Sequence, residues 1–214
     1  MTPVTYLIAT RSRGKLRELR ALFASRGLDV IDLADAGISE SPDEETIESW
    51  ETFEENALAK AQYFHQRSGL PTFADDSGLV VPALGGRPGV RSKRWSGRSD
   101  LAGSALDAAN NDVLHGEIRR HGGFPSAAEY VCAAAFADDA RAIVRTGRTA
   151  GEIVDKAAGR QGFGYDPYFR SSELGRTFAE ATVAEKGAVS HRARAFAALL
   201  DSLLSAPPSR PGRR

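Results

Sequence analysis

The sequence predicts an α/β fold built on a mixed β-sheet, and two observations carry this prediction. Residues 4–33 have the pattern of a buried strand, a helix and a second strand, and such a βαβ unit favours parallel neighbours in a sheet. The runs 130–137 and 142–149 are strand-like and are joined by an acidic turn, which predicts an antiparallel hairpin. A sheet that contains both kinds of pairing is mixed.

The βαβ unit is predicted from its apolar runs and its turn residues. Residues 4–10 are β-branched and apolar, typical of a buried strand, and a polar, basic turn follows at residues 11–15. Apolar side chains at helical spacing then continue to about Arg26, and Gly27 is placed to end that helix. Residues 28–33 predict the second strand.

A second helix is predicted to begin after an acidic, irregular stretch at residues 34–51. Thr52 can cap its first turn, and Glu55, three positions later, can reach back to complete a capping box. Gly69 marks its end. A short strand at residues 71–74 then delivers Asp75, Asp76, Ser77 and Gly78 at its carboxyl end. The remaining predicted elements are a long loop at 85–99, a helix from Leu101 to about Arg120, a glycine-rich loop at 159–164, and a last helix carried by Phe196, Leu199, Leu200 and Leu203.

Composition excludes several classes of protein. Lysine plus arginine and aspartate plus glutamate both number 28, and this balance argues against wholesale binding to nucleic acid or to anionic membranes. Cys132 is the only cysteine and lies in an apolar run, so we expect a buried side chain and no intrachain disulfide. No apolar run approaches the roughly 20 residues of a membrane span, and we expect a soluble, cytoplasmic protein. Residues 1–204 predict one domain, and residues 205–214 a disordered tail.

Two clusters in the first half of the chain have the residue types of a phosphate and metal site. A turn between a strand and a helix faces phosphate with backbone N–H groups and the helix dipole, and Lys15 adds charge. The spacing is not that of a P-loop, and a solvated basic turn is the alternative. Asp75 and Asp76 are oxygen donors of the kind that Mg²⁺ prefers, although Asp, Ser and Gly also favour ordinary turns. Glu48, in the acidic stretch, is either a further metal ligand or a solvated side chain.

The third cluster lies late in the chain and has the residue types of a base-binding site. Phe163 or Tyr165 can stack on a base, and Asp166, His191 and Arg192 can form hydrogen bonds with its edge. A cation such as Lys186 can bind phosphate or base. Packing in the core is the alternative for the aromatic residues, and the outer face of the last helix is the alternative for the charged ones.

Taken in order, these motifs resemble those of the inosine triphosphate pyrophosphatase family over about residues 7–200. The matching segments are ATRSRGK (9–15), ETFEENALAKA (51–61), ADDSGL (74–79), LGGRPGVRSKRWSG (84–97), GFGYDPYF (162–169), EK (185–186) and SHR (190–192). The resemblance implies two α/β lobes around a long mixed sheet, with a central nucleotide-binding cleft. It also implies a magnesium-dependent homodimer that hydrolyses noncanonical purine nucleoside triphosphates (ITP, dITP, XTP) to the monophosphate and pyrophosphate.

The resemblance also implies a role for each matching residue. Asp76 corresponds to the catalytic aspartate, and Glu48, Asp75 and Asp76 to the metal ligands. The residues that correspond to substrate contacts are Thr10, Ser12, Lys15, Ser77, Phe163, Gly164, Tyr165, Asp166, Lys186, His191 and Arg192.

One departure from the family pattern concerns the first motif, which usually reads T-G-N-x-x-K. Here Arg11 and Ser12 replace the glycine and the asparagine, whereas Lys15 is kept, so we expect retained phosphate binding with altered affinity. Three other functions stay open: a Maf-type pyrophosphatase for modified pyrimidine nucleotides, a nucleotide-binding regulator without catalysis, and a nucleic-acid-binding module suggested by the arginine-rich segment 87–98.

Overall fold

The computed structural model describes residues 4–205, which divide into two compact units. Unit 1 comprises residues 4–75, 133–147 and 194–205, and unit 2 comprises residues 76–132 and 148–193. The single domain predicted over 1–204 remains a prediction, and the predicted tail lies, apart from Ser205, outside the described residues. Within residues 4–205, no helix combines the length and the apolar character that crossing a bilayer requires.

The strands form one six-stranded sheet in the order β2-β1-β3-β4-β5-β6. Their bounds are β1 Tyr6–Ile8, β2 Val30–Asp32, β3 Thr72–Val80, β4 Ser126–Ala137, β5 Ala142–Ile153 and β6 Phe169–Ser171. Strand β1 pairs in parallel with both β2 and β3, whereas β5 and β6 are antiparallel. The predicted mixed sheet is therefore confirmed. Cys132 is fully buried in β4, as predicted.

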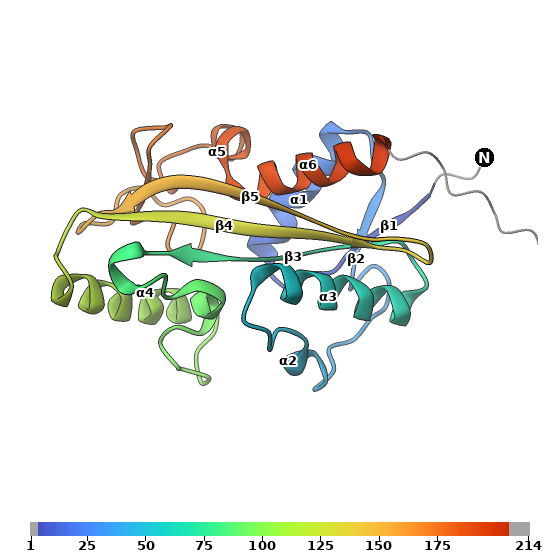
Figure 1. Ribbon diagram of the computed structural model, residues 1–214, viewed down its shortest axis with the longest axis horizontal. Helices are drawn as coiled ribbons and strands as arrows, with labels where there is room; N and C mark the ends of the chain where they lie inside the picture. Colours follow the sequence, from blue (N-terminus) through green and yellow to red (C-terminus); the bar gives the residue numbers. More distant parts are fainter. Residues whose placement is uncertain (1–3, 206–214) are drawn as a thin grey trace, which may run out of the picture. The chain divides into compact units, whose positions relative to one another are not determined.

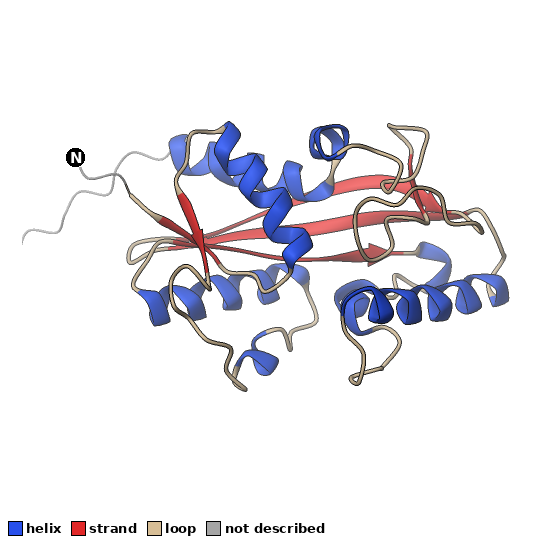
Figure 2. Ribbon diagram, turned by 180° about the vertical axis from the view of Figure 1, so that it is seen from behind, coloured by secondary structure: helices blue, strands red, loops and turns tan. Residues whose placement is uncertain are grey.

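In unit 1, helices cover both faces of the strands (Figures 1 and 2). The helices are α1 Arg13–Ser25, α2 Glu44–Ile47, α3 Phe53–Ser68 and α6 His191–Ser205, the last belonging to unit 1 from residue 194 onward. Helices α1 and α6 lie on one face and α3 on the other. The core is aromatic: the Phe73 ring lies 4.8 Å from that of Phe23, 4.9 Å from that of Phe136 and 6.2 Å from that of Phe196.

The ends of α3 lie where the turn residues predict them. Thr52 accepts a hydrogen bond from the backbone N–H of Glu55 and donates its hydroxyl to the Glu55 carboxylate at 2.6 Å. Gly69 ends the helix with φ 69°, a left-handed conformation that glycine adopts without steric cost. This helix is the element that carries Lys60 toward β3.

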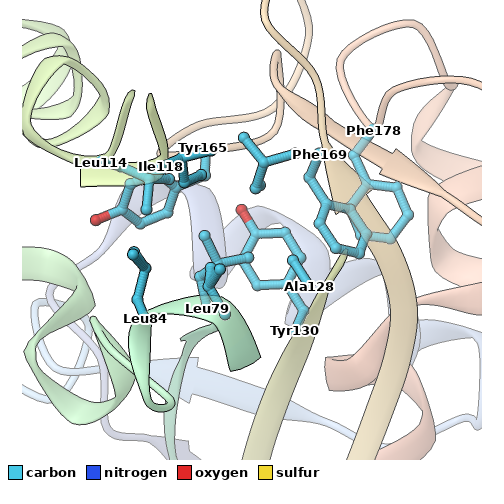
Figure 3. Close-up of a cluster of buried hydrophobic side chains, with 11 residues drawn as sticks. Leu79, Leu84, Leu114, Ile118, Ala128, Tyr130, Tyr165, Phe169 and Phe178 are labelled. Atoms are coloured by element: carbon cyan, nitrogen blue, oxygen red, sulfur yellow. The ribbon is translucent and has the colours of Figure 1, made fainter. Parts of the chain in front are cut away.

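In unit 2, helix α4 and two 3₁₀ turns cover one face of the strands, and α5 lies on the other (Figure 1). Their bounds are η1 Pro82–Leu84, η2 Gly89–Arg94, α4 Gly103–Arg120 and α5 Val183–Val189. Figure 3 shows the apolar core of this unit, in which the Phe169 ring lies 4.6 Å from that of Tyr130 and 5.0 Å from that of Phe178.

The secondary structure differs from the prediction at several places. Asp75 to Gly78 lie inside β3, which continues to Val80, and not at its carboxyl end. The segments predicted as irregular, 34–51 and 85–99, contain α2 and η2, and η1 precedes the predicted loop. Strand β6 and helix α5 were not predicted, although Thr182 and Glu185 form a complete capping box at the start of α5. These elements are short, and short elements carry too few residues for a clear periodicity.

Candidate active site

In unit 1, two side chains shape the turn between β1 and α1. The Thr10 hydroxyl accepts a hydrogen bond from the Ser12 backbone N–H at 3.2 Å. Ser12 has extended backbone angles (φ −78°, ψ 114°), and its hydroxyl accepts from the Lys15 backbone N–H at 3.4 Å. Ser12 is therefore the N-cap of α1, and it fixes the helix start from which the Lys15 side chain projects.

Lys15 and Lys60 meet two of the predicted metal carboxylates. Lys15 Nζ lies 3.0 Å from Asp75 Oδ2, and the Asp75 side chain is almost fully buried. Lys60 Nζ donates to the Asp75 backbone carbonyl at 2.9 Å and forms an ion pair with Glu48. We call Lys15, Glu48, Lys60 and Asp75 the lysine–carboxylate cluster. The structure thus brings together three of the predicted residues and adds Lys60.

Sequence reasoning missed Lys60 because a single lysine in an alanine-rich helix looks like part of a solvated face. Its only signal is its place on α3, two turns beyond the Thr52 cap. A cavity of about 420 Å³ in unit 1 is a different feature, since it is lined by the end of α3 and the β4–β5 turn and contains none of the predicted residues.

Arg11, which replaces the usual glycine, is directed to an acidic partner. Its guanidinium donates two hydrogen bonds to the Glu44 carboxylate, at 3.1 and 2.8 Å, and a third to the Ile38 carbonyl at 2.9 Å. The hydrogen bond with Glu44 raises the pKa of Arg11 above its ordinary value. Its charge is thus largely committed to Glu44, and Ser12 retains the capping function.

Within the described residues, no three histidine, cysteine, aspartate or glutamate side chains gather into a ready-made metal site. Glu48 and Asp75 are instead each in contact with a lysine. Oxygen-only donors still suit Mg²⁺, which commonly uses one or two carboxylates and completes its shell with water and substrate phosphate. The donor set is chemically suited to that ion.

In unit 2, Asp76 is linked through Ser77 to Arg192. Asp76 is 6% exposed, and its Oδ1 accepts a hydrogen bond from the Ser77 backbone N–H at 2.9 Å, which fixes the carboxylate orientation. The Ser77 hydroxyl in turn accepts from Arg192 Nη2 at 2.7 Å. Ser77 and Arg192 are 115 residues apart along the chain, yet this hydrogen bond joins them within unit 2.

Phe163 lies beside two cations of the same unit. Lys186 Nζ is 5.1 Å from the centre of the Phe163 ring, and the Arg192 guanidinium carbon is 5.9 Å from it. Lys186 also donates to Asp166 Oδ2 at 2.6 Å, and Asp166 Oδ2 accepts from the Phe163 backbone N–H at 2.9 Å. We call Phe163, Asp166, Lys186 and Arg192 the aromatic–cation cluster. A half-buried ring next to cations is a surface on which a planar base can stack.

Two other predicted contacts have their side chains engaged with the protein. Tyr165 is buried, its hydroxyl donates to the Ser92 carbonyl at 2.8 Å, and burial raises the pKa of this phenol. The His191 ring is buried and stacked on Tyr130, with centroids 4.6 Å apart and planes 8° apart. Both side chains therefore pack in the interior of unit 2.

Comparison with known proteins identifies relatives over nearly the whole chain. The family model described as the Ham1 family matches residues 6–202. The chain is 46% identical to the dITP/XTP pyrophosphatase of Burkholderia pseudomallei over 200 residues, which is 92% of both chains. It is 45% identical to that of Ralstonia nicotianae over 201 residues, covering 92% of this chain and 95% of the relative.

Solved structures agree with these matches. A HAM1 protein from Coxiella burnetii aligns with a TM-score of 0.79 at 31% identity, covering 95% of this chain and 100% of that one. A nucleoside-triphosphatase / dITP/XTP pyrophosphatase from Mycobacterium abscessus aligns with a TM-score of 0.66 at 40% identity, covering 92% and 99%. The family match over residues 6–202 includes every residue of both clusters. This chain therefore belongs to the Ham1 family.

Proposed function

We propose that this protein hydrolyses noncanonical purine nucleoside triphosphates, with ITP, dITP and XTP as substrates, to a nucleoside monophosphate and pyrophosphate. Its membership of the Ham1 family and its likeness to dITP/XTP pyrophosphatases support the proposal. Removal of such nucleotides protects the precursor pool from damaged bases. We propose further that the enzyme acts in the cytoplasm as a homodimer and binds neither nucleic acid nor membrane.

The observation that carries the proposal is a pair of consecutive, buried carboxylates on β3. Asp75 is 1% and Asp76 6% exposed, and burying two acidic groups is costly unless charges or hydrogen bonds compensate. Asp75 lies against Lys15, whereas Asp76 accepts the Ser77 N–H. Buried acidic groups with charged partners cluster at functional sites, and a hydrolase that acts on a charged phosphate chain uses such groups.

We assign Asp76 as the residue that activates water. Its carboxylate accepts a proton as the water oxygen bonds to the α-phosphorus, and the bond from that phosphorus to the bridging oxygen of pyrophosphate breaks. Lys15, with Thr10 and Ser12 shaping the turn around it, offers positive charge to the outer phosphate oxygens. Lys60 can add a second ammonium group from α3.

We assign Glu48, Asp75 and Asp76 as the residues that would hold Mg²⁺. The bound ion would neutralise phosphate charge and stabilise the leaving pyrophosphate. The lysines that contact Glu48 and Asp75 orient these carboxylates.

For the base, we propose that Phe163 stacks on the purine while Ser77, Asp166, Lys186, His191 and Arg192 line the remainder of its site, with Gly164 and Tyr165 holding the loop. Arg192 is a buried hydrogen-bond donor, and such a donor suits the 6-oxo group of hypoxanthine or xanthine. The amino group of adenine would leave the donor unpaired, which disfavours ATP.

The test is product analysis with ITP, XTP, dATP, GTP and 5-methyl-UTP, each with Mg²⁺ and with a chelator. Asp76→Asn should lower kcat for ITP by about 10²–10⁴-fold, the usual contribution of a general base, while nucleotide binding persists. Asp112→Asn, at an exposed position on α4, is the matched control. Wild-type turnover by Asp76→Asn would contradict the assignment, and cleavage of 5-methyl-UTP alone would favour the pyrimidine-specific alternative.

A further inference from the structure

One glycine next to Phe163 is held at both of its backbone polar groups by a single helix. The Gly164 N–H donates to Asp107 Oδ2 at 2.8 Å, and the Gly164 carbonyl accepts from Asn111 Nδ2 at 3.0 Å. Asp107 and Asn111 are four residues apart on α4, so their side chains lie on one face of that helix. They are more than 50 residues away from Gly164 along the chain.

The orientation of the Asn111 amide is fixed by its partners. Its nitrogen donates both to the Gly164 carbonyl and to the Asp107 backbone carbonyl, at 3.0 and 2.8 Å. Both partners are acceptors, so the nitrogen and not the oxygen must face them. Asn111 is 6% exposed, and its Oδ1 is a buried atom with no hydrogen-bond partner within residues 4–205. The amide nitrogen therefore satisfies two backbone carbonyls, whereas the amide oxygen has no partner among the described residues.

We call the hydrogen bonds of Asp107 and Asn111 with Gly164 the clamp. The clamp holds the residue next to Phe163, the proposed stacking surface for the base. Gly164 has φ 64°, a left-handed conformation in which its peptide groups can face α4. On the other side of Phe163, the backbone N–H of that residue donates to Asp166 Oδ2 at 2.9 Å. The Phe163 backbone is therefore held on both sides, by Asp166 before the ring and by α4 after it.

We propose that Asp107 and Asn111 are positioning residues that set the place of the Phe163 ring, and through it the affinity and selectivity for the purine base. This inference rests on the proposed function, because it takes Phe163 as the stacking surface. Asp107 and Asn111 do not touch the nucleotide themselves. A loop that is ordered before binding loses less conformational entropy when the base arrives, so the clamp strengthens base binding.

The clamp predicts a defect confined to recognition of the base. Asp107→Ala leaves the Gly164 N–H without its acceptor, and we expect about tenfold weaker binding of IMP and a similar rise in KM for ITP, with kcat within about twofold. Asn111→Leu removes the donor to the Gly164 carbonyl, so we expect the same effect on IMP binding together with a lower midpoint of thermal unfolding. Asp107→Asn keeps an oxygen that can accept the same hydrogen bond and should restore IMP binding to within about twofold of wild type.

The experiment is calorimetric titration of IMP and steady-state hydrolysis of ITP and ATP, together with inhibition by inorganic tripolyphosphate. Tripolyphosphate carries no base, so its inhibition constant should be unchanged in every variant. Asp112→Ala, an aspartate truncation at an exposed position of the same helix, is the matched control. The ITP-to-ATP preference should fall in Asp107→Ala and Asn111→Leu only.

Two results would overturn the clamp. One is IMP binding and ITP selectivity in Asp107→Ala and Asn111→Leu equal to those of Asp112→Ala. The other is an equal loss of tripolyphosphate and IMP binding, which would indicate general damage to the fold. A wild-type protein that hydrolyses none of the tested triphosphates would refute the proposed function itself, which separates that failure from failure of the clamp.

Discussion

Gly78 lies in β3 where an added methyl group would collide with the chain that packs against it. A Cβ atom at this position would be 2.4 Å from the Gly89 carbonyl oxygen and 2.4 Å from Ser92 Oγ. Ser92 Oγ is itself committed, because it donates to the Gly89 carbonyl at 2.7 Å and accepts from the Leu79 N–H at 2.8 Å. Gly78→Ala therefore forces both the η2 turn and these hydrogen bonds to shift.

The expected cost follows from these contacts. Overpacking of a filled site costs about 1–3 kcal/mol, and each of two lost hydrogen bonds adds about 1 kcal/mol, so Gly78→Ala should lower the free energy of unfolding by about 3–5 kcal/mol. Because β3 also carries Asp76 and Ser77, activity should fall as well. Ser92→Ala loses the two hydrogen bonds without the collision, and we expect a smaller loss of about 1–3 kcal/mol.

Urea unfolding of the variants measures these differences. Gly116→Ala is the matched control, because a Cβ there meets only Arg120 Nη2 at 3.5 Å and lies inside helix α4. Alanine is the better helix former, so the control should gain up to about 1 kcal/mol. If Gly78→Ala unfolded within about 1 kcal/mol of wild type, the inferred close approach of η2 to β3 would be wrong.

Three further predictions concern charge and proton binding. Lys60→Met removes the ammonium group that contacts the Asp75 carbonyl, and we expect kcat/KM for ITP to fall about tenfold or more; unchanged kinetics would remove Lys60 from the site. Burial lowers the pKa of His115, so the folded state favours the neutral ring. The free energy of unfolding should therefore have its full value above about pH 6.5, the pKa of an unfolded histidine, and should decrease as the pH falls from there through the lower pKa of the folded state. Urea unfolding at pH 7.5 and 5.5 should show a smaller loss for His115→Leu than for wild type. Arg11→Gly breaks a partly exposed ion pair with Glu44, so it should cost at most about 1 kcal/mol and leave KM for ITP within about twofold in steady-state assays.

Local signals were sufficient for the parts of the fold that depend on neighbours in sequence. The cap at Thr52 and the left-handed Gly69 delimit α3, and the strand–helix–strand pattern gave the parallel pair β1 and β2. The end of β3 was placed wrongly because Asp, Ser and Gly favour turns as isolated residues. Packing overrides that preference here. A side chain at position 78 would collide with Ser92, and the sequence alone does not show that Ser92 lies next to this position.

The candidate site was predictable as a set of residue types and not as a set of contacts. Asp76, Ser77 and Arg192 are joined by hydrogen bonds that no spacing rule indicates. Tyr165 has the residue type of a base contact, but its hydroxyl is bonded to Ser92. Burial and pairing depend on long-range topology, and a single sequence carries little information about it.

The unusual first motif still provides a cap for helix α1. Serine and asparagine are about equally good at the N-cap of a helix, so Ser12 can start α1 as asparagine would. The extra charge at Arg11 finds an acidic partner, Glu44, in the short helix α2. The β1–α1 turn therefore presents Lys15 to Asp75 without competition from Arg11. The altered motif thus has both a capped helix start and a lysine beside Asp75, which is why we expect phosphate binding to persist with Arg11 and Ser12 in place.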